Sequence, residues 1–302
     1  MQVLLAEDSR LYQQLTTRLL QDWAFEVVIA ENGVKAWELL QKPDAPTIAL
    51  IDWVLPDIDG LELCRRIRRS SNPALYTYTV LVTAKGTHAN LLEGMEAGAD
   101  DYLIKPFDPL ELRARLVVGE RILNLHSKLA EANEQLRFAA TYDSLTRLLN
   151  RREILDFLDR ELHRAKRESR TVSVVIADVD HFKHINDSYG HPAGDTVLIE
   201  LAKKLKANLR VYDAVGRYGG EEFLMVLPTC SLKDAVRRAE ETRQLVHQDI
   251  TAGDDKQPVT LSLGVAVAVP ERKVSPEVLI NEADIALYRA KNNGRNRVEV
   301  YC

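Results

Sequence analysis

The sequence has few cysteines and no long apolar run, and both features narrow the class of protein to which it can belong. Cys64, Cys230 and Cys302 are far apart and outside any Cys-x-x-Cys spacing, which predicts free thiols rather than disulfides or a zinc site. No run reaches the roughly 18 apolar residues that a membrane span needs. The apolar run near Met1 is VLLA, which is too short for a signal peptide. We therefore expect a cytoplasmic protein without membrane insertion.

The sequence also lacks an excess of positive charge. Its 40 lysines and arginines face 45 acidic residues, for a net charge of −5. No overall basic field would draw it to a nucleic acid polymer. Beyond residue 120 no helix-turn-helix pattern or basic recognition segment appears, which disfavours a transcription factor. The length of 302 residues and a hydrophobic content of 46% predict about two globular domains.

The first part of the chain alternates short apolar runs with amphipathic stretches. This pattern predicts a parallel sheet covered by helices on both faces. In such a sheet, groups that follow the carboxyl ends of the strands converge on one crevice. The five predicted strands are VLLA (3–6), EVVIA (26–30), TIALID (47–52), TVLVT (79–83) and DYLIK (101–105).

Charged and hydroxyl side chains stand at the ends of these strands. Glu7 and Asp8 follow the first strand, and Asp52, Thr83 and Lys105 close the third, fourth and fifth. Three carboxylates that meet would repel one another unless a divalent cation lay among them, and Mg²⁺ prefers such oxygen ligands. One carboxylate could then accept a phosphoryl group. Each residue alone could be a helix cap or a surface side chain, but five coinciding at strand ends favour a site.

This arrangement resembles a response regulator receiver domain over residues 1–118, in the segments IDWVLPDIDG, VTAKG and YLIKPF. The resemblance implies a flavodoxin-like α/β fold with a five-stranded parallel sheet. It also implies that Asp52 is the phosphoacceptor and that Glu7 and Asp8 help it to hold Mg²⁺. Thr83 and Lys105 would contact the phosphoryl group, and Tyr102 would be the switch aromatic residue. The phosphoryl donor would be a sensor histidine kinase.

The connecting segment, residues 109–140, continues the last receiver helix as a linker. Its apolar residues recur at alternating spacings of four and three, namely Val118, Ile122, Leu125, Leu129, Ala132, Leu136 and Ala139. That seam predicts a long helix and a two-stranded parallel coiled coil, hence a homodimer. The alternative is a single helix that packs on its own domain.

Residues 141–302 show a different, mixed pattern. Helices are predicted near 150–168, 195–209, 231–247 and 276–291, with strands at 172–180, at 259–267 and in the final RVEVY. A hairpin around Gly219-Gly220 reverses the strand direction, which predicts an antiparallel α+β unit. For this Gly-Gly segment alone, a plain two-residue turn would suffice.

Acidic residues at the ends of these strands indicate chemistry. Asp178 and Asp180 share one face of an apolar strand, and Glu221 follows the hairpin glycines. If the strand lies beside the hairpin, Asp178 and Glu221 can share a divalent metal, as phosphate chemistry requires. Gly219 and Gly220 would then let a triphosphate lie against the backbone.

Four motifs complete a second resemblance. YDSLTRLLNRR (142–152), FKHINDSYGHPAGD (182–195), RVYDAVGRYGGEEF (210–223) and LYRAKNNGRN (287–296) are similar to the GGDEF family of diguanylate cyclases. The resemblance covers residues 141–302. It implies a polymerase-palm-like α+β domain that condenses two GTP molecules into cyclic di-GMP and two pyrophosphates. Two domains would have to face each other, because each binds one GTP.

The resemblance also implies roles for individual residues. Asp178 and Glu221 would bind Mg²⁺, or Mn²⁺ in its place, with the Val179 carbonyl, and Glu222 would lie near the metals and the 3′-hydroxyl group. Asn186 and Asp195 would bind the guanine edge, and Asp195 would select GTP over ATP. The phosphates would meet Lys291 and Arg295, taken to be one helical turn apart, and the backbone amides of Phe182 and Lys183. Outside the motif set, Asn186 could cap a turn, and Lys291 and Arg295 could form a solvated helix end.

Arg210 and Asp213 form the RxxD motif that, by the resemblance, binds cyclic di-GMP as a feedback inhibitor. Two departures accompany it. Glu241 stands where the family often has a further arginine, although Arg237, Arg238 and Arg243 are nearby. Arg147 stands where glycine is usual, and because it lies at the entrance of the domain we attach no chemistry to it.

These observations favour a diguanylate cyclase that is activated through Asp52 phosphorylation and a rearrangement of the dimer. Two other classes stay open. A binding module would report GTP or cyclic di-GMP without catalysis. Such relatives usually lose the signature acids, which here are Glu221 and Glu222. A structural adaptor would use the second domain only to dimerise and would bind no nucleotide.

Overall fold

The computed structural model of the chain describes residues 1–70, 76–84, 88–252, 257–272 and 274–301. It divides into two compact units, Met1–Glu134 and Gln135–Cys302. Among the described residues, no helix combines the length and apolarity needed to cross a membrane. Cys64 and Cys230 are free and buried, whereas Cys302 lies outside the described residues.

The first unit contains the predicted five-stranded parallel sheet, in the order β2-β1-β3-β4-β5. Every predicted strand is found within two residues of its expected ends. The strands are β1 (Gln2–Ala6), β2 (Glu26–Ala30), β3 (Ile48–Asp52), β4 (Tyr78–Thr83) and β5 (Asp101–Ile104).

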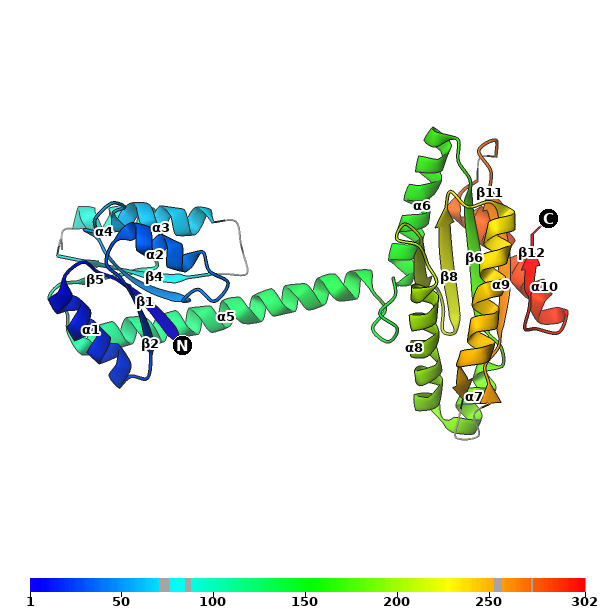
Figure 1. Cartoon of the computed structure of the whole chain (residues 1–302), viewed down its shortest axis with the longest axis horizontal. Helices are drawn as coiled ribbons and strands as arrows, with labels where there is room; N and C mark the ends of the chain where they lie inside the picture. Colours follow the sequence, from blue (N-terminus) through cyan, green and yellow to red (C-terminus); the bar gives the residue numbers. More distant parts are fainter. Residues whose placement is uncertain (71–75, 85–87, 253–256, 273, 302) are drawn as a thin grey trace. The chain divides into compact units, whose positions relative to one another are not determined.

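Helices cover both faces of this sheet because its strands alternate their side chains. Leu4 and Ala6 pack in one core with residues of α2 and α3, and Val3 and Leu5 pack in another with residues of α1 and α5. Figure 1 shows α2, α3 and α4 on one side and α1 and α5 on the other. The helices are α1 (Arg10–Asp22), α2 (Gly33–Leu40), α3 (Gly60–Arg69), α4 (His88–Glu96) and α5 (Pro109–Thr141).

Helix α5 is a single helix of 33 residues, and only its first part is packed on the receiver sheet. Leu112, Leu116 and Gly119 are buried. A Cβ atom at Gly119 would lie 2.4 Å from the Tyr78 ring, so glycine is what lets the helix approach β4. By contrast, Leu125, Leu129 and Leu136 of the predicted seam are exposed in the single chain. The long helix is therefore found, and its pairing into a coil stays a prediction.

The second unit is built on a five-stranded sheet in the order β12-β11-β6-β8-β7. Strands β6, β7, β8 and β11 pair antiparallel, as expected, but β12 pairs parallel with β11. The predicted antiparallel unit is therefore found, with one parallel pair at its edge, because α10 returns the chain across the sheet between β11 and β12. The strands are β6 (Val172–Val179), β7 (Ala214–Arg217), β8 (Glu222–Pro228), β9 (Thr251–Ala252), β10 (Gln257–Pro258), β11 (Leu261–Ala268) and β12 (Val298–Val300).

Two layers of helices enclose this sheet (Figure 1). Val175 and Ala177 of β6 pack in a core with residues of α7, α8 and α9, whereas Val174 and Ile176 pack with residues of α6 and α10. The helices are α6 (Arg151–Glu168), α7 (Phe182–Tyr189), α8 (His191–Ala207), α9 (Leu232–Asp249) and α10 (Pro276–Asn292).

The segment before α8 differs from the sequence prediction. A helix was expected near 195–209 only, whereas the structure has α7 and then α8 from His191. Gly190 separates the two helices with a φ of 81°, and Pro192 lies in the first turn of α8. Proline fits that turn because its missing N–H would have no helical partner there. Helix α7 is therefore separate from α8 and follows closely after β6.

Candidate functional site

The first cluster forms at the carboxyl ends of β1 and β3. Glu7, Asp8 and Asp52 each offer one carboxylate oxygen within 4.8 Å of the others, and among the described residues this is the single trio of possible metal ligands that meets that distance. Glu7 and Asp52 are buried, and Asp8 is exposed. Hard oxygen donors in a group of this kind fit Mg²⁺. The structure thus brings the three predicted ligands together.

Lys105 supplies the positive charge of this cluster. Its Nζ atom lies 2.6 Å from Glu7 Oε2 and 2.6 Å from Asp52 Oδ2, and 4.2 Å from the centre of the Tyr12 ring. Burial raises the pKa of Glu7, opposed by Lys105 and assisted by the Asp52 charge. Burial alone would lower the pKa of Lys105, but its hydrogen bonds to Asp52 and Glu7 outweigh that and raise it. One ammonium group faces three carboxylates, so the cluster retains an excess of negative charge that suits a cation.

The two remaining receiver residues lie next to this cluster on β4 and β5. Thr83 ends β4, is buried, and its carbonyl accepts a hydrogen bond from the Lys105 amide. Tyr102 lies on β5, with the Arg115 guanidinium 5.8 Å from its ring centre. Arg115 belongs to α5, so the ring that we expect to act as the switch contacts the long helix itself.

The second cluster lies where β6 and β8 run side by side. Asp178 faces Glu222 in the register of the two strands, and the Val179 amide donates to the Glu221 carbonyl at 3.4 Å. Lys291 from α10 places its Nζ atom 2.8 Å from Asp178 Oδ2. Burial raises the pKa of Asp178 to about 6, against the effect of Lys291, and the charges of Glu221 and Glu222 raise it further. The acids are therefore close enough to repel one another.

A loop of four residues, 218–221, joins β7 to β8, rather than a two-residue turn. Neither Gly219 nor Gly220 has a positive φ, so the backbone does not need glycine there for its conformation. A Cβ atom on Gly220 would have no atom within 4 Å, and one on Gly219 would meet the end of the Glu222 side chain. Space beside Gly220 is open, as expected if a ligand approaches the backbone here.

A cavity of about 480 Å³ opens on one side of this loop. Asn186 and Asp195, the predicted guanine residues, line it with Phe182 and Lys183, and so do Gly220 and Glu221. Gly194 makes room for Asn186, because a Cβ atom there would lie 2.0 Å from Asn186 Oδ1. Residues from α7, from α8 and from the loop 218–221, which we call the signature loop, thus share one cavity.

Glu222 lines a different cavity, of about 800 Å³, with Arg151, Tyr218 and residues of α6 and α10. The Arg151 guanidinium lies 4.7 Å from the centre of the Tyr218 ring. The two signature acids therefore face two cavities, Glu221 the one beside α7 and α8 and Glu222 the one between α6 and α10.

The expected placement of Arg295 is wrong. Helix α10 ends at Asn292, Gly294 has a φ of 111°, and Arg295 lies beyond it with a φ of 60°. Lys291 and Arg295 are thus not one helical turn apart, because glycine stops the helix between them. Arg295 is exposed, whereas Lys291 points to Asp178.

The RxxD segment has one buried and one exposed member. Asp213 Oδ2 lies 2.6 Å from Arg238 Nη1 and accepts the Arg210 amide at 2.8 Å. The Arg210 side chain is exposed and donates to the Tyr212 hydroxyl group. Of the nearby arginines, Arg238 is buried and paired with Asp213, and Arg237 lies 3.6 Å from Glu241.

Two sets of contacts near the site, those of Asp180 and of Arg217, were missed from the sequence. Asp180 lies beyond β6 and accepts hydrogen bonds from Thr260, Ser262 and the Asn296 amide, so it ties β6 to β11 and to the turn after α10. Arg217 donates to the Gly220 carbonyl at 2.7 Å and lies 3.2 Å from Asp143. Asp180 ends an apolar run and Asp143 stands in the motif 142–152, but partners so distant in sequence cannot be found from spacing.

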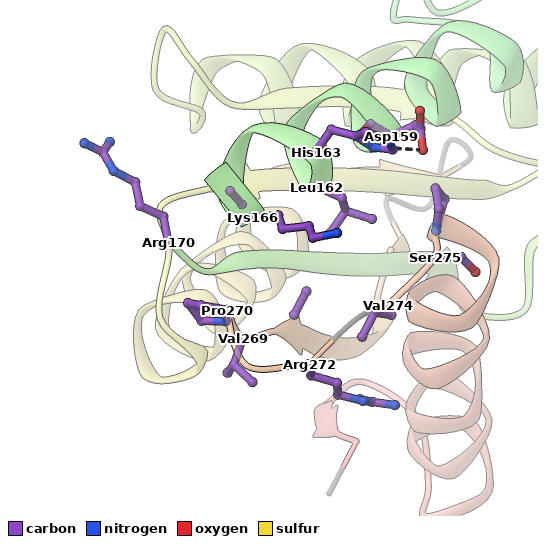
Figure 2. Close-up of a pocket in the computed structure, with 13 residues that line it drawn as sticks. Asp159, Leu162, His163, Lys166, Arg170, Val269, Pro270, Arg272, Val274 and Ser275 are labelled. Carbon is purple, nitrogen blue, oxygen red and sulfur yellow. Dashed lines mark hydrogen bonds and ion pairs between the residues drawn. The ribbon is translucent and has the colours of Figure 1, made fainter. Parts of the chain in front are cut away.

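A further cavity of about 370 Å³ (Figure 2) shares Asp159, Ser275 and Pro276 with the cavity that Glu222 lines. It opens between α6, the end of β11 and the start of α10, and Lys166 and Arg272 are among its lining residues. Arg272 pairs with the buried Glu282, and His163 lies 3.7 Å from Asp159. No predicted site residue lines this cavity.

Comparison with known proteins supports both domain predictions. Residues 3–117 match the family described as response regulator receiver domain, and residues 140–297 match the family described as diguanylate cyclase, GGDEF domain. The response regulator PleD of Caulobacter vibrioides is 34% identical over 83% of this chain and 56% of its own length. The diguanylate cyclase DosC of Escherichia coli is 37% identical over 64% of this chain and 42% of its own length.

Among solved structures, the coiled coil and GGDEF domain of DgcB from Caulobacter crescentus, in complex with c-di-GMP, is similar to this chain. The two share 33% identity with a TM-score of 0.54, over 63% of this chain and 98% of that one. This chain spans about half the length of the curated relatives that it matches. The receiver fold at the N-terminal end and the GGDEF-like fold that follows the helix are confirmed.

Proposed function

Because this chain belongs to the GGDEF family of diguanylate cyclases and carries a response regulator receiver domain, we propose that it is a diguanylate cyclase controlled by phosphorylation of Asp52. The observation that carries the catalytic half is the cavity in which Asn186 and Asp195 lie with Gly220 and Glu221. In this cavity, two side chains that can hydrogen-bond the edge of guanine lie with Gly220, beside which space is open, and with Glu221.

GTP would enter this cavity with its base between α7 and α8. The Asp195 carboxylate accepts hydrogen bonds from guanine N1–H and the amino group, whereas adenine has no N1–H donor. Asn186 would hydrogen-bond the same base edge. The triphosphate would then run past Gly219 and Gly220, where Phe182 and Lys183 offer backbone amides at the start of α7.

The acids at the ends of β6 and β8 suit a divalent cation. Asp178 has a raised pKa and lies near two further carboxylates, which is the charge excess that a metal would relieve. Asp178 and Glu221, with the Val179 carbonyl, would hold Mg²⁺ or Mn²⁺, which would neutralise the phosphates and favour ionisation of the attacking hydroxyl group. Lys291 orients Asp178, and Arg295 is exposed and free to meet the phosphates.

Two copies are needed for the complete reaction. The 3′-oxygen of each GTP attacks the α-phosphorus of the other, the bond to pyrophosphate breaks, and the proton leaves the hydroxyl group toward Glu222 or solvent. After both attacks the ring is closed and two pyrophosphates have left. The exposed seam of α5, with Leu125, Leu129 and Leu136, would pair two chains as a homodimer.

Phosphorylation would act through the receiver cluster. Mg²⁺ held by Glu7, Asp8 and Asp52 would neutralise the incoming phosphoryl group. Lys105, at 2.6 Å from Asp52, would contact its oxygens with Thr83. A sensor histidine kinase is the proposed donor. Tyr102, which already contacts Arg115 of α5, would pass the change to the long helix and so to the dimer.

The product would also act as a feedback inhibitor. Arg210 is exposed beside Asp213, whose side chain is buried, so the Arg210 guanidinium is available for a guanine base or a phosphate. Because Arg238 is paired with Asp213, Arg210 would bind the inhibitor without a contribution from Arg238.

The first test uses purified protein with GTP and Mg²⁺, with and without beryllofluoride as the phosphoryl mimic. Cyclic di-GMP, separated by chromatography, should appear faster with the mimic, and Asp52→Asn should abolish only the difference. If GTP binds but neither condition gives product, the chain is a binding module. If no GTP binds, it is an adaptor. An unchanged response in Asp52→Asn would refute the regulatory half alone.

A further inference from the structure

The loop that joins α5 to α6 contains a residue held in an unfavourable backbone conformation. Arg147 has a φ of 60°, in the left-handed region that residues with a side chain rarely adopt. Such a conformation persists only when surrounding contacts compensate for it. The Arg147 amide donates to the Asp143 carbonyl at 3.0 Å, which closes a tight turn and sends the side chain back toward α5.

The Arg147 side chain ends on an aromatic pair at the end of α5. Its guanidinium lies 4.5 Å from the centre of the Phe138 ring, and Phe138 stacks on Tyr142 with 5.0 Å between the ring centres. Arg147 is itself exposed, so an arginine without a task here could face water. Among the described residues, the hydrogen bonds of the Asp143 turn and the contact with Phe138 together hold Arg147 in this conformation.

Asn150 fastens the same loop to both helices. Its Nδ2 atom donates to the Ala140 carbonyl at 2.9 Å, at the end of α5, and its Oδ1 atom accepts the Glu153 amide at 3.0 Å, at the start of α6. One side chain thus hydrogen-bonds a carbonyl group at the end of α5 and an amide group at the start of α6, both of which the helices themselves leave unpaired.

The loop is fastened equally to the signature loop. Asp143 accepts from the Thr146 amide and hydroxyl group and lies 3.2 Å from Arg217. Arg217 donates from Nε and Nη2 to the Gly220 carbonyl, at 3.0 and 2.7 Å. Its own amide donates to the Leu149 carbonyl at 2.9 Å. A continuous set of contacts thus runs from Phe138 to Gly220.

We propose that Arg147 is a positioning residue, which holds the end of α5 on the Asp143 turn and through Arg217 fixes the place of Gly220, Glu221 and Glu222. This inference rests on the proposed cyclase activity and adds to it a residue that touches no substrate. Asn186 and Asp195 lie on α7 and α8, outside this set of contacts, so their hydrogen bonds to the guanine edge should persist. Gly220 and Glu221 line the same cavity, and Arg147 affects turnover through their position.

The decisive variant is Arg147→Gly. Glycine adopts a φ of 60° without strain, so the melting temperature should stay equal or rise while the contact with Phe138 disappears. We expect turnover to fall about fivefold, as loss of a cation–π contact of ordinary strength allows, and KM for GTP to change by a smaller factor than turnover, because the guanine contacts of Asn186 and Asp195 persist. Amide hydrogen exchange at residues 219–222 should become faster.

Two sets of variants separate positioning from general damage. Phe138→Tyr keeps the ring and should keep turnover, whereas Phe138→Ala should match Arg147→Gly, and the double variant should lose no more than either alone. Ser169→Gly is the matched control, since Ser169 also has a positive φ, 52°, at the other end of α6 but no aromatic contact in the described residues. It should leave turnover and loop exchange unchanged.

The outcomes distinguish this inference from the proposed function. If the unmodified protein makes no cyclic di-GMP, the proposed function fails, and hydrogen exchange in the Arg147→Gly variant still decides the positioning role. Unchanged exchange and turnover in Arg147→Gly would overturn the inference. So would additive losses in the double variant, or the same loss in Ser169→Gly.

Discussion

The acidic clusters of the two units differ in how completely the single chain assembles them. In the receiver unit, Lys105 lies between Glu7 and Asp52, and the three side chains are 9%, 4% and 12% exposed. In the cyclase unit, Asp178 is as well buried, but its cation, Lys291, is 32% exposed and the signature acids face two open cavities. The first cluster is closed around one cation, and the second is open.

The difference follows from what supports each cluster. Parallel strands bring their carboxyl ends to a single edge, so one sheet supplies Glu7, Asp52 and Lys105 together. The cyclase residues come from a strand end, a loop and two helices, and they leave space for a nucleotide. A small phosphoryl group suits the first arrangement, and a large substrate shared between two copies suits the second.

The largest expected effect would come from breaking the open cluster. Glu221→Gln removes a proposed metal ligand without changing the size of the side chain, and cyclic di-GMP synthesis should fall about 1,000-fold. The side chain is half-buried and no ion pair holds it in the described residues, so the melting temperature should hardly move. Chromatography of the nucleotides and a thermal scan measure the two effects. Activity within tenfold of the unmodified protein would remove Glu221 from the reaction.

The next effect compares the two lysines. Lys105→Ala leaves buried carboxylates without their cation and should destabilise the receiver unit by about 3 kcal/mol. Lys291→Ala removes a partly exposed partner and should cost less than about 1 kcal/mol. Urea unfolding with EDTA present measures both. Addition of Mg²⁺ should recover part of the Lys105→Ala loss, because a cation can take the vacated place. Equal losses for the two variants would contradict the difference between closed and open clusters.

A smaller effect is expected in the cavity that opens beside the signature loop. Asp195→Ala should raise KM for GTP by about tenfold to a hundredfold, because the hydrogen bonds to guanine are lost. Its exposed side chain should leave the melting temperature unchanged. Initial rates with GTP and ATP measure the change in preference. Asp187→Ala, on the same cavity, is the control, and an equal change in both variants would argue against a specific role of Asp195.

The smallest effect concerns pH. The pKa of Asp178 is raised from 3.8 to about 6 by burial, so between these values the folded protein binds the proton more tightly than the unfolded chain. The contribution of this group to stability is therefore full below about pH 4 and is lost as pH rises through 6. Relative to Asp178→Asn, the free energy of unfolding should fall by about 1–2 kcal/mol between pH 4 and 7.

Chemical denaturation in EDTA at several pH values measures that difference. Bound Mg²⁺ should reduce the decline, because a cation favours the charged carboxylate. A difference between the two proteins that stays constant with pH would show that Asp178 has an ordinary pKa.

Much of the site could be predicted because its residues stand at strand ends. Asp52 and Asp178 each close an apolar run, and period-two alternation already assigns their faces. Arg295 was misplaced because the assumed spacing carried the helix past its predicted end near residue 291, although Gly294 is a usual helix stop. The pairing of Arg238 with Asp213 was not foreseen for another reason. Asp213 precedes β7 whereas Arg238 lies on α9, and spacing along the chain contains no information about such pairs.

The sequence by itself determined the two fold classes, the order of the elements and the acids at the strand ends, because apolar periodicity and turn residues are local properties. Tertiary structure alone decided which cation each acid receives, which cavity each signature acid faces, and why Arg147 has a strained backbone. These depend on contacts such as those of Lys105 with Glu7 and of Arg217 with Gly220 and Asp143. Such contacts form only when distant segments pack together, and their geometry is set by the packed elements.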